Sequence, residues 1–339
     1  MSSDPNTSAT ASPNLRVSVV IPVYSGQETL PSLMAELGHY TSPTKTAQGH
    51  TFTIEEVLLV WDRGPRGSDQ TIRDLAQKYS WVKPLWLSRN FGQHAATLAG
   101  MTSSGGDWIV TMDEDGQQDP AFIADMIDSA YAHKAQLVYA TPRNPPPHSK
   151  IRNLGSKSAK KLFAGVLADG GFAEFNSYRL VLGEIGRSVA AYTGTGVYLD
   201  VALSWVVADV TTCPVTAREE GRPAANYNYR RLAGHFGRLI VSSGTKPLFF
   251  VSWLGIFFVA LGGLASLWVI YQRVTGEVII AGWASTFIAL MLIGGAILLS
   301  LGIVAQYVGA ATNMSLGKPL YVVVRDPKDT FDPQAHQDS

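Results

Sequence analysis

Residues 108–120 read Trp-Ile-Val-Thr-Met-Asp-Glu-Asp-Gly-Gln-Gln-Asp-Pro, an apolar run that ends in alternating carboxylates. The apolar run predicts a buried strand, and side chains of extended backbone point to the same side at every second residue. Asp113 and Asp115 are therefore expected to face the same side at the end of a strand. Asp119 followed by Pro120 predicts the N-cap and the first residue of a helix. The sequence thus places an acidic turn between a strand and a helix.

This acidic turn is a candidate metal site. Two carboxylates at this spacing offer the hard oxygen ligands that Mg²⁺ or Mn²⁺ prefers, and such ions are commonly shared with substrate phosphates. In open α/β sheets, ligands bind beyond the carboxyl ends of the strands, which is where this turn falls. A short acidic turn can equally be a solvated loop, so the interpretation depends on the rest of the chain.

The first part of the chain alternates short apolar runs with amphipathic segments. The runs predict strands at Val17–Val23, Ile54–Trp61, Val82–Leu87, Trp108–Met112 and Leu137–Ala140. The amphipathic segments predict helices at Glu28–Leu37, Thr71–Tyr79, Gly92–Ser103 and Pro120–Lys134. Ser68 or Asp69 is expected to cap the second helix. This alternation predicts an α/β fold with a mostly parallel sheet that is covered by helices on both faces.

Beyond residue 140 the pattern is less regular. We expect helices at Ser149–Ala168, Ser188–Val207 and Tyr229–Ser243, and a strand at Asp209–Ala217. The only cysteine of the sequence, Cys213, excludes an internal disulfide and is expected to be a small buried residue of that strand.

Composition excludes some classes of function. The 339 residues include 27 Lys+Arg and 27 Asp+Glu, so the chain carries no net charge. No basic block interleaved with aromatic residues occurs, which argues against nucleic-acid binding. Residues 1–14 are polar and lack the apolar core of a secretion signal, so we expect them to be disordered.

Two long segments near the C-terminus lack charged residues, one between Lys246 and Arg273 and one between Glu277 and Lys318. Within them, 247–271 and about 283–308 are each long enough to cross a bilayer core of about 30 Å. Flanking Trp and Tyr and paired glycines favour membrane spans over buried helices of a soluble protein. Basic residues are more frequent outside the pair than between its members, which predicts a hairpin with both termini in the cytoplasm.

Several motifs, in order along the chain, resemble the polyprenyl-phosphate glycosyltransferases of glycosyltransferase family 2, such as dolichol-phosphate mannose synthases and bactoprenol glucosyltransferases. The resemblance runs from about Val17 to Val324. Its motifs are Val20-Ile21-Pro22-Val23-Tyr24 with Glu28, Leu87-Ser88-Arg89-Asn90-Phe91-Gly92, Met112-Asp113-x-Asp115-x-Gln117-x-x-Pro120, Tyr227-x-x-x-Arg231-Leu232, Thr245-Lys246-Pro247-Leu248 and Lys318-Pro319-Leu320-Tyr321-Val322-Val323.

The resemblance implies a GT-A glycosyltransferase domain, which is a Rossmann-like α/β fold, followed by a two-helix transmembrane hairpin. It implies that the nucleotide-sugar is bound by Pro22, Val23, Tyr24, Glu28, Asp62, Asp113 and Glu114. It implies a Mg²⁺ or Mn²⁺ ion held by Asp113, Asp115 and Gln117. It places the lipid phosphate at Arg143, Arg152, Ser156 and Arg218. Asp115 and Glu174 are the catalytic candidates.

The chain departs from the family pattern in three places, one of which is two extra residues between Arg218-x-x-Gly221 and Tyr227. Relatives usually carry two adjacent Asp followed by Gly-Ser after the second main strand, where only Asp62 remains here, in a longer loop. Relatives often carry Asp-Phe-Arg near the active site, where this chain has Ser177-Tyr178-Arg179. The nearest acidic residue to Ser177 is Glu174.

The implied organisation is a cytoplasmic catalytic domain at 15–228, a juxtamembrane amphipathic helix at 229–246, a hairpin at 247–310 and a cytoplasmic tail at 311–339. The chain would then be a multi-pass protein of the cell membrane that transfers a sugar, with a UDP-sugar as first expectation, to polyprenyl phosphate for cell-envelope glycans. Paired glycines on both spans would permit a homo-oligomer. Two alternatives remain: a membrane-tethered nucleotide-sugar binding protein without catalysis, and a polysaccharide synthase of the same superfamily.

Overall fold

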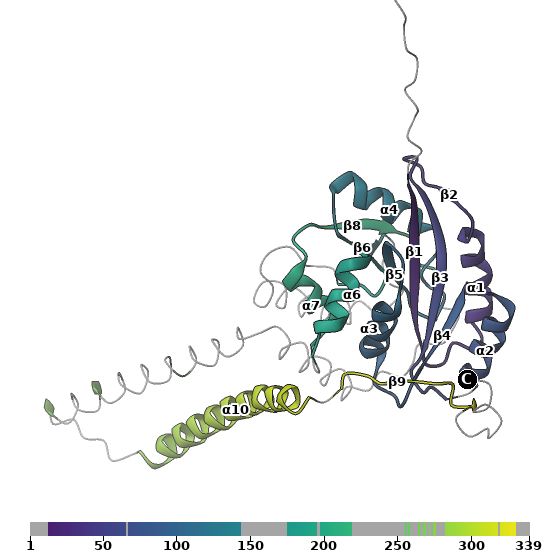
Figure 1. Ribbon diagram of the computed structural model, residues 1–339. Coiled ribbons are helices and arrows are strands. Elements are labelled where there is room, and N and C mark those ends of the chain that lie inside the picture. The colour runs from purple at the N-terminus through teal and green to yellow at the C-terminus, as the bar shows by residue number, and fades with distance from the viewer. Residues whose placement is uncertain are drawn as a thin grey trace, which may run out of the picture.

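The computed structural model describes residues 13–65, 67–143, 175–194, 197–218, 282–317 and 319–329, with isolated positions between 255 and 275. Their main body is an α/β domain with a twisted sheet between two layers of helices (Figure 1). Among the described residues the sheet has nine strands, in the order β8-β6-β7-β5-β1-β3-β4-β9 with β2 beside β3.

The centre of the sheet is parallel, as the sequence predicts. β1 (Asn14–Val23) lies between β5 (Trp108–Thr111) and β3 (Thr51–Trp61), and β4 (Val82–Leu87) follows β3. Nearly every residue of β1 is buried, since both faces of the strand are covered. The carboxyl ends of these four strands therefore lie at one edge of the sheet, the lower edge in Figure 1.

The other strands complete the sheet at its two sides. β6 (Leu137–Pro142) and β8 (Val210–Val215) are parallel to each other, whereas β7 (Arg179–Leu182) runs antiparallel between β5 and β6. β2 (Thr44–Lys45) pairs with β3, and β9 (Val323–Val324) pairs antiparallel with β4. The sequence predicts neither β7 nor the two-residue strands β2 and β9. Cys213 is buried in β8, as expected.

Each face of the sheet has its own hydrophobic core. One core contains apolar residues of α1 (Leu30–Leu37), α2 (Ser68–Lys78) and α4 (Phe122–His133). The second contains residues of α3 (Gln93–Ser103), α6 (Gly183–Tyr192) and α7 (Leu199–Val206). A single 3₁₀ turn, η1 (Gly38–Tyr40), follows α1.

A glycine lets α3 lie directly on the sheet. A Cβ atom at Gly100 would approach Cγ1 of Val20 to 2.3 Å, closer than real contacts allow. This close approach fixes the N-terminus of α3, which begins at Gln93, near the carboxyl ends of β1 and β3.

Several predicted helix limits are wrong, and α1 begins at Leu30 rather than Glu28. α2 begins at Ser68 with Gly67 as its N-cap, and the Ser68 hydroxyl instead donates to the Tyr24 carbonyl (3.3 Å). α4 begins at Phe122 rather than Pro120, although Asp119 Oδ1 accepts the Ala121 N–H (2.9 Å) as the predicted N-cap residue would. The single helix predicted at 188–207 is two helices, α6 and α7, with the helix-weakening Gly194 between them.

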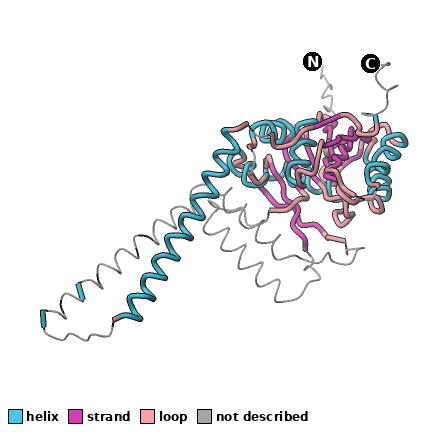
Figure 2. The backbone as a smooth tube through the Cα atoms, turned by 90° about the horizontal axis from the view of Figure 1, so that it is seen from below, coloured by secondary structure: helices cyan, strands magenta, loops and turns pink. Residues whose placement is uncertain are grey.

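α10 (Trp283–Ser315) extends away from the α/β domain (Figures 1 and 2). In the parts of the chain that the structure describes, no helix combines the length and hydropathy of a membrane span. The helices predicted at 149–168 and 229–246 lie outside the described residues, as does nearly all of the predicted span 247–271.

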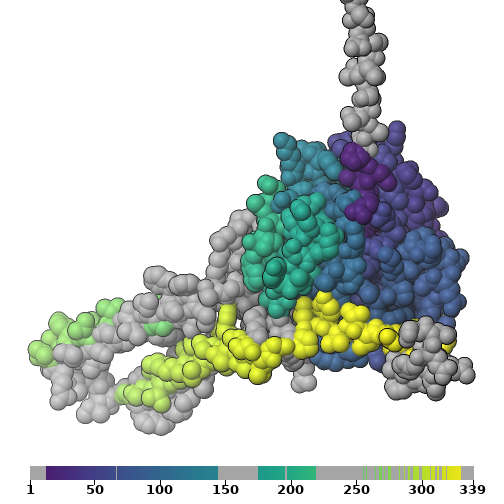
Figure 3. All heavy atoms as spheres, viewed as in Figure 1, coloured from purple at the N-terminus to yellow at the C-terminus, as the bar shows by residue number. Residues whose placement is uncertain are grey.

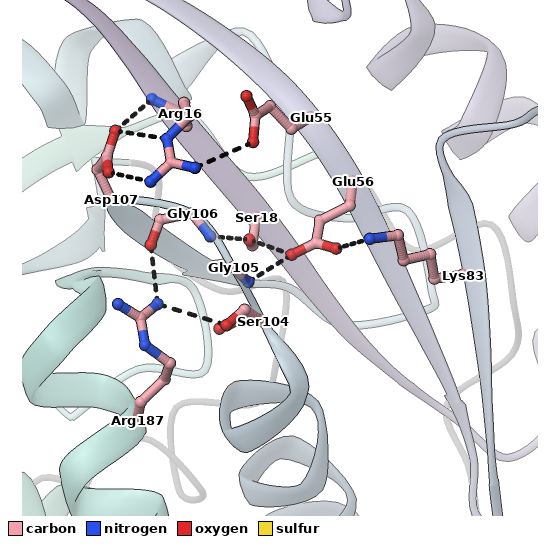
Figure 4. Close-up of polar contacts among 10 residues, drawn as sticks. All are labelled: Arg16, Ser18, Glu55, Glu56, Lys83, Ser104, Gly105, Gly106, Asp107 and Arg187. Atoms are coloured by element: carbon pink, nitrogen blue, oxygen red, sulfur yellow. Dashed lines mark hydrogen bonds and ion pairs between the residues drawn. The ribbon is translucent and has the colours of Figure 1, made fainter.

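A polar network closes the opposite edge of the sheet, at the amino ends of β1 and β5 (Figure 4). The buried Glu56 carboxylate accepts bonds from Ser18 Oγ (2.7 Å), Gly105 N–H (2.6 Å) and Lys83 Nζ (2.5 Å). Arg16 pairs with Asp107 (2.7 Å) beside it. The network joins the α3–β5 connection to β1 and β3.

Glu56→Gln is expected to destabilise the fold in a pH-dependent way. Burial raises the pKa of Glu56, but the bonds from Lys83, Ser18 and Gly105 outweigh it and lower that pKa below its ordinary value. A lowered pKa in the folded state stabilises the fold above the unfolded pKa and stops doing so as pH falls through the folded pKa. We expect a loss of about 1–3 kcal/mol in the free energy of unfolding near neutral pH.

The measurement is urea unfolding of the two proteins at several pH values. The difference between them should shrink below pH 4.5, the ordinary pKa of this carboxyl. Glu55→Gln, an exposed neighbour, is the control and should change stability by less than about 0.5 kcal/mol. A Glu56→Gln difference that stays constant down to pH 3, roughly 1.5 units below that pKa, would contradict the assignment.

Candidate active site

The acidic turn lies at the carboxyl edge of the sheet, beyond β5. Asp113 is half-buried there and accepts hydrogen bonds from three side chains of separate segments. Gln93 Nε2 donates to Oδ1 (2.6 Å), while Ser177 Oγ (2.5 Å) and Gln118 Nε2 (2.9 Å) donate to Oδ2. All three donors are neutral, so they orient the carboxylate without cancelling its charge. Burial raises the pKa of Asp113, and the Ser177 bond partly opposes that shift.

Asp115 differs from Asp113 in being exposed on the turn. Its Oδ1 accepts the Gln117 N–H (3.0 Å), and Gly116 between them has a φ of +74°, a conformation that glycine adopts without strain. The charge of Asp115 contributes to the raised pKa of Asp113, which indicates that the two carboxylates are close. The structure thus places the predicted pair together.

The donor set fits a divalent ion that is shared with a substrate. In the described part of the chain, no group of three or more His, Cys, Asp or Glu side chains gathers as a complete metal site. Asp113, Asp115 and the side-chain oxygen of Gln117 would therefore supply only part of a coordination shell. Mg²⁺ usually keeps such open positions for water and substrate phosphates.

Glu114 binds the loop that follows β1. Its carboxylate accepts the backbone N–H groups of Tyr24 (3.0 Å) and Ser25 (3.0 Å), and its carbonyl accepts the Thr29 hydroxyl (2.5 Å). Glu114 therefore joins the loops after β5 and β1. The sequence predicts it as a nucleotide-sugar contact, and the structure gives it a role in shaping the walls of the site.

Asp62 joins the loops after β3 and β4, as Glu114 joins the loops after β5 and β1. Its buried carboxylate accepts the backbone N–H groups of Phe91 (2.7 Å) and Gly92 (2.8 Å). Burial raises the pKa of Asp62, and these two bonds act in the opposite direction. The Asp62 N–H in turn donates to the Val23 carbonyl (2.9 Å), so β1, β3 and β4 are joined at their ends.

The residues of β1 and its following loop that the sequence predicts to bind the nucleoside lie next to these bonds. Pro22 and Val23 are buried at the end of β1, whereas Tyr24 and Glu28 are exposed on the loop beyond it. The loop after β3 lies against Tyr24, because a Cβ on Gly64 would clash with the Tyr24 carbonyl. The Tyr24 side chain is 47% exposed and is thus accessible to a ligand.

A buried ion pair, which the sequence does not predict, lies behind Ser177 and stabilises its position. Arg179 of β7 pairs with Asp200 of α7, and both side chains are almost fully buried. Arg179 Nε donates to Thr111 Oγ1 (3.1 Å), whose hydroxyl donates to the Ser177 carbonyl (2.6 Å). In the sequence, the arginine among the apolar residues 178–182 is the one sign of a buried charge that needs a partner. The pair holds Ser177 against Asp113.

The predicted lipid-phosphate residues are only partly described. Arg218 pairs with Glu36 (2.8 Å) and Asp119 (2.9 Å), and its N–H donates to the Gln117 carbonyl (3.0 Å), which places it beside the acidic turn. Arg143 is exposed at the end of β6. Arg152, Ser156 and the catalytic candidate Glu174 lie outside the described residues.

The fold and this site define a class of protein. An α/β domain with a parallel centre, whose strand ends carry an oriented carboxylate pair, is a Rossmann-like domain of the kind that binds nucleotides. Residues 18–186 match the model of a family described as Glycosyl transferase family 2, and the chain carries a glycosyltransferase family 2 domain. The α/β fold that the sequence predicts is thereby confirmed.

Relatives with assigned activities align over nearly the whole chain. The undecaprenyl-phosphate 4-deoxy-4-formamido-L-arabinose transferase of Salmonella choleraesuis (strain SC-B67) is 29% identical, over 96% of this chain and 99% of the relative. The bactoprenol glucosyl transferase of Shigella phage SfV is 21% identical, over 91% and 98%. The predicted resemblance to the polyprenyl-phosphate glycosyltransferase type is confirmed.

Solved structures resemble this chain more distantly. Glucosyl-3-phosphoglycerate synthase from Mycobacterium tuberculosis, in complex with Mn²⁺, UDP and phosphoglyceric acid, is 16% identical, with a TM-score of 0.46 over 68% of this chain and 79% of that one. Mannosyl-3-phosphoglycerate synthase from Rubrobacter xylanophilus is 13% identical with the same TM-score, over 67% and 72%.

Asp62→Asn is expected to destabilise the domain. The variant retains the shape of the side chain but turns one acceptor into a donor, which then faces a backbone N–H of Phe91 or Gly92. Loss of such a bond in a buried position costs about 1–3 kcal/mol. Chemical unfolding measures the change, with Asp74→Asn on the exposed face of α2 as control. If the two variants were equally stable, Asp62 would not hold the loop.

Proposed function

We propose that this chain transfers a sugar from a nucleotide-sugar to polyprenyl phosphate and yields a polyprenyl-phosphate-linked monosaccharide. The carboxylate pair at the carboxyl edge of a family 2 domain is the observation that carries the proposal. Full-length alignment with two transferases whose names specify undecaprenyl phosphate or bactoprenol supports this acceptor. A UDP-sugar is the first candidate donor.

The donor side of the reaction follows from the loops already described. Tyr24, exposed beside the Glu114 and Asp62 bridges, would lie against the nucleoside. The diphosphate would lie toward Asp113 and Asp115. These two residues would hold a Mg²⁺ or Mn²⁺ ion, with Gln117 as a further ligand. Such an ion neutralises the charge that develops on a departing nucleoside diphosphate. Gln93, Gln118 and Ser177 fix the orientation of the Asp113 carboxylate, which would make this contact.

The acceptor chemistry accounts for a serine at position 177. A sugar hydroxyl must lose a proton as it attacks, which calls for a general base. A phosphate monoester has a second pKa of about 6 and is already largely ionised at neutral pH. One of its oxygens can form the bond to the anomeric carbon while the carbon–oxygen bond to the diphosphate breaks, with inversion. If the reaction does require a general base, Glu174 is the candidate.

The membrane anchor belongs to the proposal as well. The uncharged segments 247–271 and 283–308 support a hairpin, and α10 covers the second of them. Leu290, Ile293, Ile297 and Leu301 are exposed along α10, and a lipid phase would cover such side chains. The catalytic domain and both termini would then be cytoplasmic, next to the membrane that contains the acceptor.

One alternative has specific support. Asp62 and Glu114 bind backbone groups, and Ser177 stands where relatives often have a carboxylate, so a nucleotide-sugar binding protein without catalysis is the second candidate. Incubation of membranes with radiolabelled nucleotide-sugars separates the two. Label in the lipid extract supports transfer, whereas binding without labelled lipid supports the alternative.

Asp115→Ala is expected to lower transfer on the order of 100-fold or more, because it removes the exposed carboxylate of the pair. The readout is labelled lipid formed with Mn²⁺ or Mg²⁺ present. Asp125→Ala, an exposed carboxylate on α4, is the control and should retain full transfer. Full activity of the Asp115→Ala variant would end the proposal of a metal-bound donor.

Arg152→Ala is expected to raise the KM for lipid phosphate about tenfold and to leave the KM for the nucleotide-sugar unchanged. A charge-assisted bond to phosphate contributes about 1.5–3 kcal/mol, and 1.4 kcal/mol corresponds to tenfold. Lys160→Ala, in the same basic stretch, is the control. An equal rise in both KM values would argue for a structural role of Arg152.

A further inference from the structure

The segment 320–326, which follows α10 in the chain, adds a strand to the domain's sheet. Its strand β9 pairs with the end of β4, with Val324 opposite Trp86 and Val323 opposite Leu87. One step further, the Ser88 N–H donates to the Val322 carbonyl (3.0 Å). Figure 3 shows the C-terminal residues, in yellow, lying across the surface of the domain.

Side-chain contacts fix this segment near both of its ends. The Tyr321 hydroxyl donates to Thr102 Oγ1 of α3 (2.9 Å). At the other end, Asp326 accepts two bonds from Arg73 of α2, from Nε (2.7 Å) and Nη2 (2.8 Å). The two side chains are only 13% and 16% exposed, and the Arg73 guanidinium also lies over the Trp86 ring at 5.0 Å. A bidentate, shielded pair of this kind is directional and stronger than an exposed ion pair.

The loop that this segment binds leads directly to the candidate site. Ser88, the partner of Val322, is its first residue. Phe91 and Gly92, at its far end, donate to Asp62. The next residue, Gln93, donates to Asp113. A single short loop thus binds Val322 at its first residue and leads at its other end to Gln93, which binds Asp113.

We propose that residues 320–326 position the nucleotide-sugar site, with Asp326 and Tyr321 as positioning residues. By fixing the start of the Ser88–Gly92 loop they fix Gln93, and through Gln93 the orientation of the Asp113 carboxylate. The segment follows α10 in the chain, so it is also the connection through which α10 would act on the donor site. The identity of the ligand rests on the proposed function, whereas the coupling of the segment to the loop does not.

Asp326→Ala in the full chain tests this inference. We expect the KM for the nucleotide-sugar to rise about fivefold to tenfold, a range typical of coupled sites, while the KM for lipid phosphate stays unchanged. Hydrogen exchange of the amides of residues 88–92 should become faster, and that of β6 should not. Tyr321→Phe should act in the same direction but more weakly. Asp329→Ala, an exposed carboxylate three residues further on, is the matched control and should change neither quantity.

The outcomes separate this inference from the proposed function. If the wild-type chain binds neither UDP nor Mn²⁺, the proposed function fails, and the exchange of residues 88–92 still decides the inference. If the wild-type chain binds them and Asp326→Ala alters neither the donor KM nor that exchange, the inference is overturned. A lower melting temperature with both quantities unchanged would make the contact merely structural and would overturn the inference too.

Discussion

The site depends on one kind of interaction. A carboxylate at the end of one strand accepts backbone N–H groups from the loop that follows the neighbouring strand of the sheet. Glu114, beyond β5, binds the loop after β1, and Asp62, beyond β3, binds the loop before α3. Loops at strand ends have no regular ladder to hold them, so these bonds replace it. They bring residues from four strands to the position where a parallel sheet binds ligands.

Within this frame, Asp113 is placed by side chains rather than by backbone. Gln93, Gln118 and Ser177 donate to its two oxygens, and the buried Arg179–Asp200 pair holds the start of β7, which Ser177 precedes by two residues. These three donors are neutral, so they orient the Asp113 carboxylate without neutralising its charge. A site of this kind is suited to bind a cation together with an anionic substrate, as the proposed transfer requires.

Local sequence patterns predict the parallel strands, most helices and the acidic turn, because these depend on apolar runs and on turn residues. They do not predict β7, which has only four residues and begins with an arginine, nor β9, which has two residues and pairs with a strand distant in the sequence. The bonds of Glu114 and Asp62 are equally non-local: Glu114 reaches 89 or 90 residues along the chain. Sequence identifies such residues as polar and near the site but cannot assign their partners.

A crystal structure of the full chain with Mn²⁺ and UDP, with the metal located by anomalous scattering, tests the central claim most directly. We expect one manganese peak between the diphosphate and the carboxylates of Asp113 and Asp115. We also expect Asp62 and Glu114 to remain bonded to their neighbouring loops. A nucleotide bound elsewhere, or one bound at this edge through Asp62 or Glu114 with no peak at the acidic turn, would contradict that claim.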